Sequence, residues 1–166
     1  MAKGPTPRDK PAPRTEARIA AVQALYQMDL AGTDLNAVIH EFETVRLKEQ
    51  AEAAGAGADR QFFADVLRGV IRRQRDIDPL IDHQLATGWR LVRVDSTLRA
   101  ILRAAVYELM ERRDVPVKVV ISEYINVAHA FFSEDEPKVV NGILDRLARQ
   151  LRVGELATPE AGTGDG

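Results

Sequence analysis

Apolar residues recur every three to four positions through most of the chain, with polar residues between them. This spacing is typical of amphipathic helices, because it gathers the apolar side chains on one face of the helix. The small-residue stretch 51–59 interrupts the pattern and is interpreted as a connection. The pattern predicts an all-α fold of about seven helices, at about 15–31, 34–47, 62–71, 77–88, 95–109, 116–128 and 136–151.

Residues with strong positional preferences mark several helix ends. Gly32 and Gly88 follow apolar stripes and are expected to end the first and fourth helices, because glycine tolerates the conformations found at helix C-termini. Asp34 is a plausible N-cap of the second helix, and Asp95 or Ser96 of the fifth, since their side-chain oxygens can accept hydrogen bonds from backbone N–H groups. These signals divide the pattern into separate helices.

The segment 115–132 allows two interpretations. Its β-branched residues, such as Val119 and Val120, would suit a buried strand. A lone strand would have no partner, however, and Pro116 is well placed for the first turn of a helix. Val117, Val120 and later apolar residues also follow a helical spacing, so a helix is the favoured interpretation.

The domain organisation follows from composition. Residues 1–13 are rich in proline and poor in apolar side chains, so we expect a flexible, basic arm. Residues 14–152 form one predicted globular domain, and residues 153–166 a flexible tail. The chain has no cysteine, no apolar signal segment and no apolar run long enough to span a membrane. A soluble, cytoplasmic protein is therefore expected.

The charge distribution favours a local anion site over general coating of nucleic acid. The net charge is −2, yet residues 1–18 and 60–75 are both rich in cations. Arginine side chains match the geometry of phosphate oxygens, and Arg72 and Arg75 are predicted to share one helical face. Most such basic runs are solvated faces, so this island remains a weak candidate for RNA binding.

The search for catalytic chemistry is mostly negative. His40, His83 and His129 lie in three different predicted helices without a metal-binding spacing, and no nucleotide-binding or nucleophile motif is present. The acidic run 134–136 lacks the alternating ligand spacing of a calcium loop and is better explained as helix N-terminal charge. Trp89 could stack on a base, although a structural tryptophan is the commoner case. No catalytic residue, metal or cofactor is predicted.

Two distant segments carry the strongest functional signal. Arg14 and Arg18 begin a helix whose apolar stripe can dock while the cations hold phosphates. Tyr26, further along that helix, is equally compatible with the core and with an RNA surface. The second segment places Lys138 and Asn141 near the start of the last predicted helix, where an amide can contact RNA.

Over roughly residues 14–152 the sequence resembles the NusB family of bacterial transcription antitermination factors. The resemblance implies an all-helical fold of two packed sub-bundles and a non-catalytic role in binding the boxA element of nascent RNA. It also implies a protein partner, NusE, a small-subunit ribosomal protein that acts with RNA polymerase on ribosomal RNA operons, and no cofactor. The segments that carry the resemblance are 21–27, 62–70, 98–109, 112–125 and 138–145.

Individual positions of this sequence match or depart from those of the family. Thr15 and Glu16 stand where some family members have arginine, which predicts fewer phosphate contacts, and Val139 replaces an aromatic residue that could stack. Leu98 occupies an acidic position of the family's partner-facing helix, so no partner residue is assigned. The RNA-binding residues implied by the resemblance are Arg14, Arg18, Tyr26, Asp135, Lys138 and Asn141.

The sequence has two alternative interpretations of function. A similar domain precedes the catalytic domain of a ribosomal RNA cytosine methyltransferase, but that enzyme needs a glycine-rich cofactor motif and a nucleophilic cysteine, and this sequence has neither. The other alternative is a structural or partner-docking protein, such as a homodimer that hides its RNA surface, and composition does not exclude it.

Overall fold

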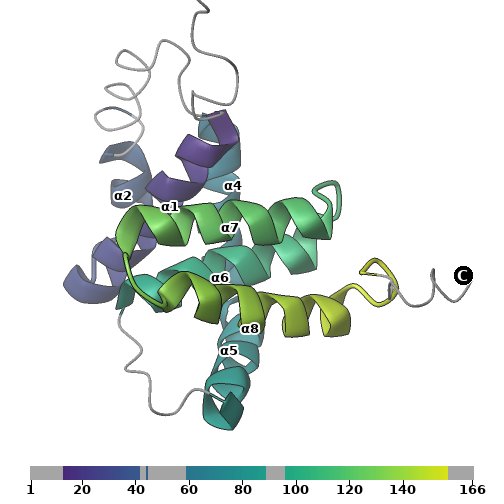
Figure 1. The fold of residues 1–166 in the computed structure, drawn as a ribbon. Helices are drawn as coiled ribbons and strands as arrows, with labels where there is room; N and C mark the ends of the chain where they lie inside the picture. The colour runs from purple at the N-terminus through teal and green to yellow at the C-terminus, as the bar shows by residue number, and fades with distance from the viewer. Residues whose placement is uncertain (1–12, 42–43, 45–58, 89–95, 157–166) are drawn as a thin grey trace, which may run out of the picture. The chain divides into compact units, whose positions relative to one another are not determined.

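The computed structural model describes residues 13–41, 44, 59–88 and 96–156 of the chain, and within these ranges all regular elements are helices. The all-α prediction is therefore confirmed. No helix in the described ranges is long and apolar enough to cross a membrane. Figure 1 shows the helices, which are α1 (Pro13–Ala31), α2 (Leu35–Glu41), α4 (Arg60–Arg72), α5 (Gln74–Gly88), α6 (Ser96–Glu111), α7 (Val117–Phe131) and α8 (Glu136–Leu151).

The predicted helix ends agree with the backbone geometry where it is described. Gly32 has a φ of 66°, and its N–H donates to the carbonyl of Met28 at 2.9 Å, which ends α1. Oδ2 of Asp34 accepts a hydrogen bond from the N–H of Ala37 at 3.2 Å, as expected of an N-cap. The later part of the second predicted helix, Trp89 and Asp95 all lie outside the described residues.

One prediction about the basic island is wrong. The chain leaves the helix between α4, which ends at Arg72, and α5, which begins at Gln74. The carbonyl of Arg73 accepts hydrogen bonds from the N–H groups of Asp76 and Ile77, both at 2.9 Å, so Arg73 starts a new helix. Arg72 and Arg75 therefore belong to different helices and do not share one helical face. The spacing of three residues would place them on one face only if the helix continued from residue 71 through residue 75.

The segment with β-branched residues forms a helix, as favoured. Pro116 stands at the N-cap of α7 with extended backbone angles (φ −61°, ψ 148°), and its carbonyl accepts from the N–H of Val120 at 3.0 Å. The apolar spacing decided the outcome, since Val117, Val120, Tyr124, Val127 and Ala128 are all buried on one side of α7.

The chain divides into two compact units, and the first comprises residues 1–71. Its described part contains α1, α2 and nearly all of α4. The buried face of α1 is made mostly of alanines, which allows close approach of neighbouring elements. The N–H of Asp59, just before α4, donates to the carbonyl of Pro13 at 3.1 Å, so the starts of α1 and α4 lie side by side.

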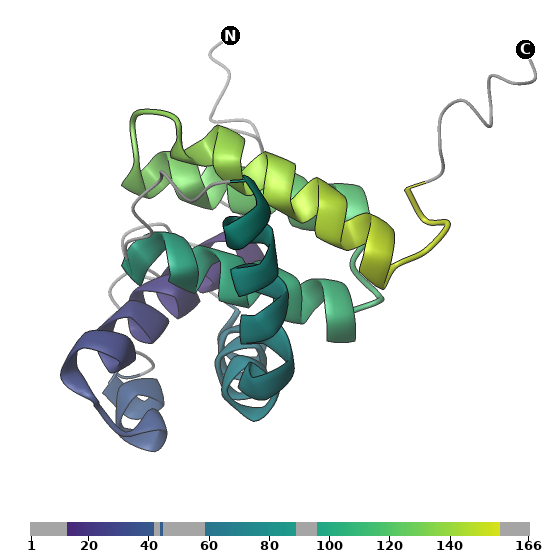
Figure 2. The same cartoon turned by 90° about the horizontal axis from the view of Figure 1, so that it is seen from below.

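The second unit, residues 72–166, contains α5 to α8 around α6. Figure 2 shows α6, α7 and α8 stacked, with α5 crossing them. Helix α6 is buried along most of its length, as its near-heptad apolar pattern predicted. Arg103 of α6 donates two hydrogen bonds to the carboxylate of Asp78 on α5, at 2.9 and 3.0 Å, which fixes the register of these two helices.

A buried arginine closes the second unit. The Arg152 guanidinium, with no exposed side-chain area, donates to the carbonyls of Leu109 (2.9 Å) and Glu108 (2.9 Å) near the end of α6. It also donates to the carbonyls of Arg112 (2.7 Å) and Val115 (2.6 Å) in the following turn. One side chain thus donates to four carbonyls at and just after the end of α6, of which those of Glu108 and Arg112 also accept from backbone N–H groups.

The chain beyond Arg152 also contributes to this unit. Glu155 accepts a hydrogen bond from the N–H of Val117 at 2.9 Å through Oε2, and the same oxygen lies 3.3 Å from the guanidinium of Arg152. The carboxylate therefore satisfies a backbone donor in the first turn of α7, where a negative charge is favoured. Residues 153–156, assigned to the tail from the sequence, form a turn in the structure.

Candidate nucleic-acid interface

Arg14 begins the candidate surface of the first unit. Its side chain is 43% exposed, and its Nε lies 3.6 Å from Oδ2 of Asp59. Its guanidinium carbon also lies 4.5 Å from the ring centroid of Phe62, which is the distance of a cation–π contact. Arg14 is thus a positioned cation with a large exposed part, which suits contact with an anion.

Arg18 occupies a different environment, although the sequence suggested the same role. The residue is only 3% exposed, and its guanidinium carbon lies 4.8 Å from the same Phe62 ring. Burial over an aromatic face holds this cation away from the surface. Arg18 is therefore suited to supporting Phe62 and, through that ring, the orientation of Arg14.

The environment of Tyr26 favours one of the two roles left open by the sequence. It is 39% exposed, whereas the preceding Leu25 is 3% exposed. The exposed ring lies one turn before Leu30, which is 62% exposed. Tyr26 therefore presents aromatic surface to solvent, as a residue that meets a base or a partner must.

The candidate surface of the second unit lies at the start of α8. Asp135 stands at the N-cap of this helix, and its carbonyl accepts from the N–H of Lys138 at 2.9 Å. The side chains of Asp135, Lys138 and Asn141 are all exposed, while Val139 is 4% exposed and belongs to the core. Val139, at the position where the resemblance implies an aromatic residue, is thus part of the core.

These positions form two separate groups. Arg14, Arg18 and Tyr26 share α1 in the first unit, whereas Asp135, Lys138 and Asn141 share the first two turns of α8 in the second. Leu98, which the resemblance aligns with an acidic partner-facing position, is 1% exposed and packs in the core.

The described residues hold no constellation suited to catalysis or metal binding. No group of three or more histidine or acidic side chains within these ranges could hold a metal ion. His40, His83 and His129 are exposed on three different helices. The acidic run 134–136 lies at the N-terminal end of α8, where its charge is favoured by the helix dipole.

Sequence reasoning missed two residues that position Arg14. Asp59 was assigned to a connection, yet its Oδ1 accepts from the N–H of Phe62 at 2.9 Å and caps α4. Phe62 was recognised only as a core residue, although its ring contacts both arginines of α1. An aspartate three residues before an apolar stripe is an N-cap signal, so the cap could have been found. The contact of Phe62 with the arginines of α1 could not have been found from the sequence.

Comparison with known proteins gives the family. The sequence model of the NusB family matches residues 15–149. The chain belongs to the NusB family. It is 54% identical over 141 residues to the transcription antitermination protein NusB of Allorhizobium ampelinum, covering 84% of this chain and 88% of that protein. The NusB of Mesorhizobium japonicum is also 54% identical, over 140 residues, with 84% and 90% covered.

Solved NusB structures share the fold. A NusB structure from T. maritima superposes with a TM-score of 0.68 at 32% sequence identity, covering 84% of this chain and 92% of that one. The solution structure of NusB from Aquifex aeolicus gives a TM-score of 0.61 at 24% identity, with 88% and 95% covered, which supports the fold alone. The NusB family consists of transcription antitermination factors, and nothing in the described residues points to catalysis.

Proposed function

We propose that this protein is a transcription antitermination factor that binds boxA RNA of nascent ribosomal transcripts together with NusE, and so helps RNA polymerase resist termination. The observation that carries the proposal is the match to the NusB family over residues 15–149. Relatives that are 54% identical in sequence are named transcription antitermination proteins. The match spans nearly the whole length of those relatives.

The surface chemistry supports an RNA-binding role. Arg14 offers an exposed guanidinium, which suits a phosphate, and Tyr26 offers an exposed ring, which suits stacking on an unpaired base. At the start of α8, Lys138 offers a second phosphate contact and the amide of Asn141 can hydrogen-bond a base edge. Asp135 can accept a hydrogen bond from a base amino group.

The two arginines of α1 have different roles in this proposal. Arg14 contacts the RNA backbone directly, whereas the buried Arg18 acts by holding Phe62 beneath Arg14. Because Glu16 stands where some family members have arginine, the first helix supplies few phosphate contacts. We therefore expect weak binding to RNA alone and tighter binding when NusE adds its own contacts.

The test is a binding assay at one stated salt concentration, using purified protein with boxA RNA and with a scrambled RNA of the same composition. Salt must be fixed, because phosphate contacts make the affinity strongly salt-dependent. The proposal expects preference for boxA that increases when NusE is added. Equal, weak binding to both RNAs with NusE present would contradict it and leave a NusB fold with another role.

A further inference from the structure

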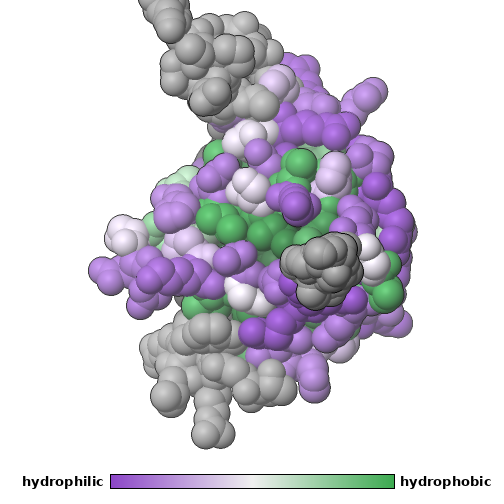
Figure 3. Space-filling model, turned by 45° about the vertical axis from the view of Figure 1, so that its right-hand side comes forward, coloured by the Kyte–Doolittle hydropathy of each residue, from purple (hydrophilic) through white to green (hydrophobic). Residues whose placement is uncertain are grey.

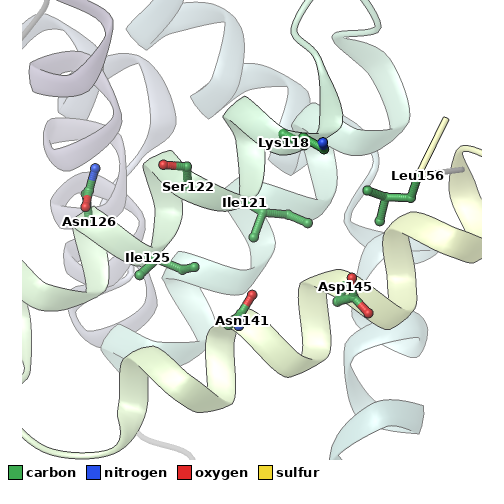
Figure 4. Close-up of a pocket in the computed structure, with 8 residues that line it drawn as sticks. All are labelled: Lys118, Ile121, Ser122, Ile125, Asn126, Asn141, Asp145 and Leu156. Carbon is green, nitrogen blue, oxygen red and sulfur yellow. The ribbon is translucent and has the colours of Figure 1, made fainter. Parts of the chain in front are cut away.

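A groove between α7 and α8 in the second unit has no role in the proposed RNA surface, apart from one shared residue. Its volume is about 320 Å³, within the range of small-ligand and peptide pockets. Figure 4 shows Ile121 and Ile125 projecting from α7 toward α8, while Asn141 projects back from α8. The eight residues that line it are Lys118, Ile121, Ser122, Ile125, Asn126, Asn141, Asp145 and Leu156.

The groove combines an aliphatic floor with a polar rim. The floor is formed by Ile121, Ile125 and Leu156, none of which is fully buried. Helices α7 and α8 lie at the front of the molecule in Figure 1. Figure 3, turned from that view, shows a green apolar band between purple polar side chains. Aliphatic surface that remains accessible inside a concave site favours an apolar occupant.

The rim groups have unused hydrogen-bonding capacity. Within the described residues, no side-chain hydrogen bond or ion pair is made by Lys118, Ser122, Asn126 or Asn141, whereas Asp145 pairs with Arg149 at 3.1 Å. Asparagine amides on both walls can bind the N–H and C=O groups of an extended backbone. An extended peptide leaves those groups unpaired, whereas a helix satisfies its own.

The charge of the groove rim favours an occupant with an acidic side chain. Lys118 is exposed at the rim and carries a positive charge without an ion-pair partner among the described residues. The one carboxylate of the rim, Asp145, is already neutralised by Arg149. The free charge of the rim is thus positive, and it complements an acidic side chain of the occupant.

We propose that this groove binds an extended peptide segment of a partner protein, with two aliphatic side chains at alternate positions on the floor and an acidic residue beside Lys118. Alternate residues of an extended chain point the same way, which matches two neighbouring isoleucines. RNA fits less well, because no aromatic side chain lines the groove as a stacking platform. The inference shares only Asn141 with the proposed RNA surface, and the variants that test it lie outside that surface.

The probes are two short peptides, acetyl-Ser-Glu-Leu-Ser-Leu-Ser-amide and the same peptide with lysine in place of glutamate. Each is titrated into the full-length, isotope-labelled protein while backbone amide signals are followed by nuclear magnetic resonance. We expect the acidic peptide to bind with a Kd below about 1 mM. Its affinity should exceed that of the basic peptide about fivefold, the magnitude of an exposed ion pair. The shifted signals should be confined to residues 118–126 and 141–145.

Two variants make the result specific. Lys118→Glu changes an exposed residue, should leave folding intact and should reverse the preference between the peptides. Ile125→Asp should weaken both peptides at least tenfold, because it places a charge on the apolar floor. Circular dichroism checks that each variant is folded.

The proposal is overturned if neither peptide binds below about 1 mM, or if Lys118→Glu leaves the preference unchanged. Weaker RNA binding by Lys118→Glu without peptide binding would assign the groove to RNA and also overturn it. Normal boxA binding by both variants is expected, and distinguishes failure here from failure of the RNA proposal.

Discussion

The hydroxyl of Tyr124 on α7 donates a 2.5 Å hydrogen bond to Oε2 of Glu108 on α6, and both residues are fully buried. A carboxyl group inside a helical core is costly unless it is hydrogen-bonded. The hydrogen bond therefore fixes the axial register of α7 against α6 more specifically than apolar packing alone does.

Tyr124→Phe removes the donor while keeping the ring. We expect a loss of about 1.5 to 3 kcal/mol in the free energy of unfolding, the range for hydrogen bonds to charged groups. Urea denaturation measures it. Tyr26→Phe is the matched control, since Tyr26 is 39% exposed and should change stability by less than about 0.5 kcal/mol. Equal small effects in both variants would show that the buried hydrogen bond contributes little.

The difference in exposure between Arg14 and Arg18 predicts different effects on RNA binding. Arg14→Met should reduce the slope of log affinity against log salt concentration by about 0.7, the value for one phosphate contact with single-stranded nucleic acid. Arg18→Met should leave that slope unchanged, because its guanidinium is buried. Loss of its contact with Phe62 should instead cost about 0.5 to 2 kcal/mol of stability. An equal fall in slope for both variants would place Arg18 on the RNA.

Asp59 restrains Arg14 electrostatically, which predicts a variant with increased RNA affinity. Asp59→Asn keeps an oxygen that can cap α4 but removes the charge 3.6 Å from Arg14. We expect the affinity for RNA at low salt to rise about two- to fivefold, since exposed ion pairs contribute up to about 1 kcal/mol. Asp59→Ala should in addition lose about 1 kcal/mol of stability with the cap.

The control for the charge effect is Asp34→Asn. Asp34 caps α2 in the same way, through the N–H of Ala37. It should leave RNA affinity unchanged, and a similar gain in this control would show that net charge, rather than the contact with Arg14, is responsible.

The carbonyls around Arg152 predict a large effect from one side chain. Arg152→Ala leaves four backbone carbonyls without this donor and should lower the free energy of unfolding by several kcal/mol, since each buried group left unsatisfied costs about 1 to 3 kcal/mol. Arg152→Lys should recover only part of this, because a single ammonium cannot reproduce the planar fork of the guanidinium. Arg149→Ala, which removes an exposed pair with Asp145, should cost less than about 0.5 kcal/mol. Thermal and urea denaturation would contradict the prediction if Arg152→Ala resembled this control.

Much of the fold could be predicted because its determinants are local. The apolar periodicity located the helices, and Gly32 and Asp34 marked the end of one and the start of the next. The apolar stripes predict a break between residues 71 and 77, but nothing in the basic run signals its exact position at Arg73, so Arg72 and Arg75 are wrongly expected on one face. Arginine is a good helix former, so local propensity gave no warning.

The candidate surface was less predictable because exposure depends on distant contacts. Arg14 and Arg18 are one turn apart and look alike in sequence, yet one is 43% exposed in its side chain and the other is buried. Both guanidinium groups lie over the ring of Phe62, more than forty positions further along the chain, yet only Arg18 is buried there. Arg152 is a similar case, since a cation near a chain end is usually exposed and here becomes part of the core.

The two oxygens of Asp59 also have a consequence for how this sequence can evolve. One oxygen caps α4 and the other faces Arg14, so selection for folding and selection for the proposed RNA binding would act on the same position. Most replacements would change both traits at once. Asparagine, serine and threonine can keep the cap while removing the negative charge, so only a small set of replacements could strengthen the proposed RNA binding here without loss of the fold.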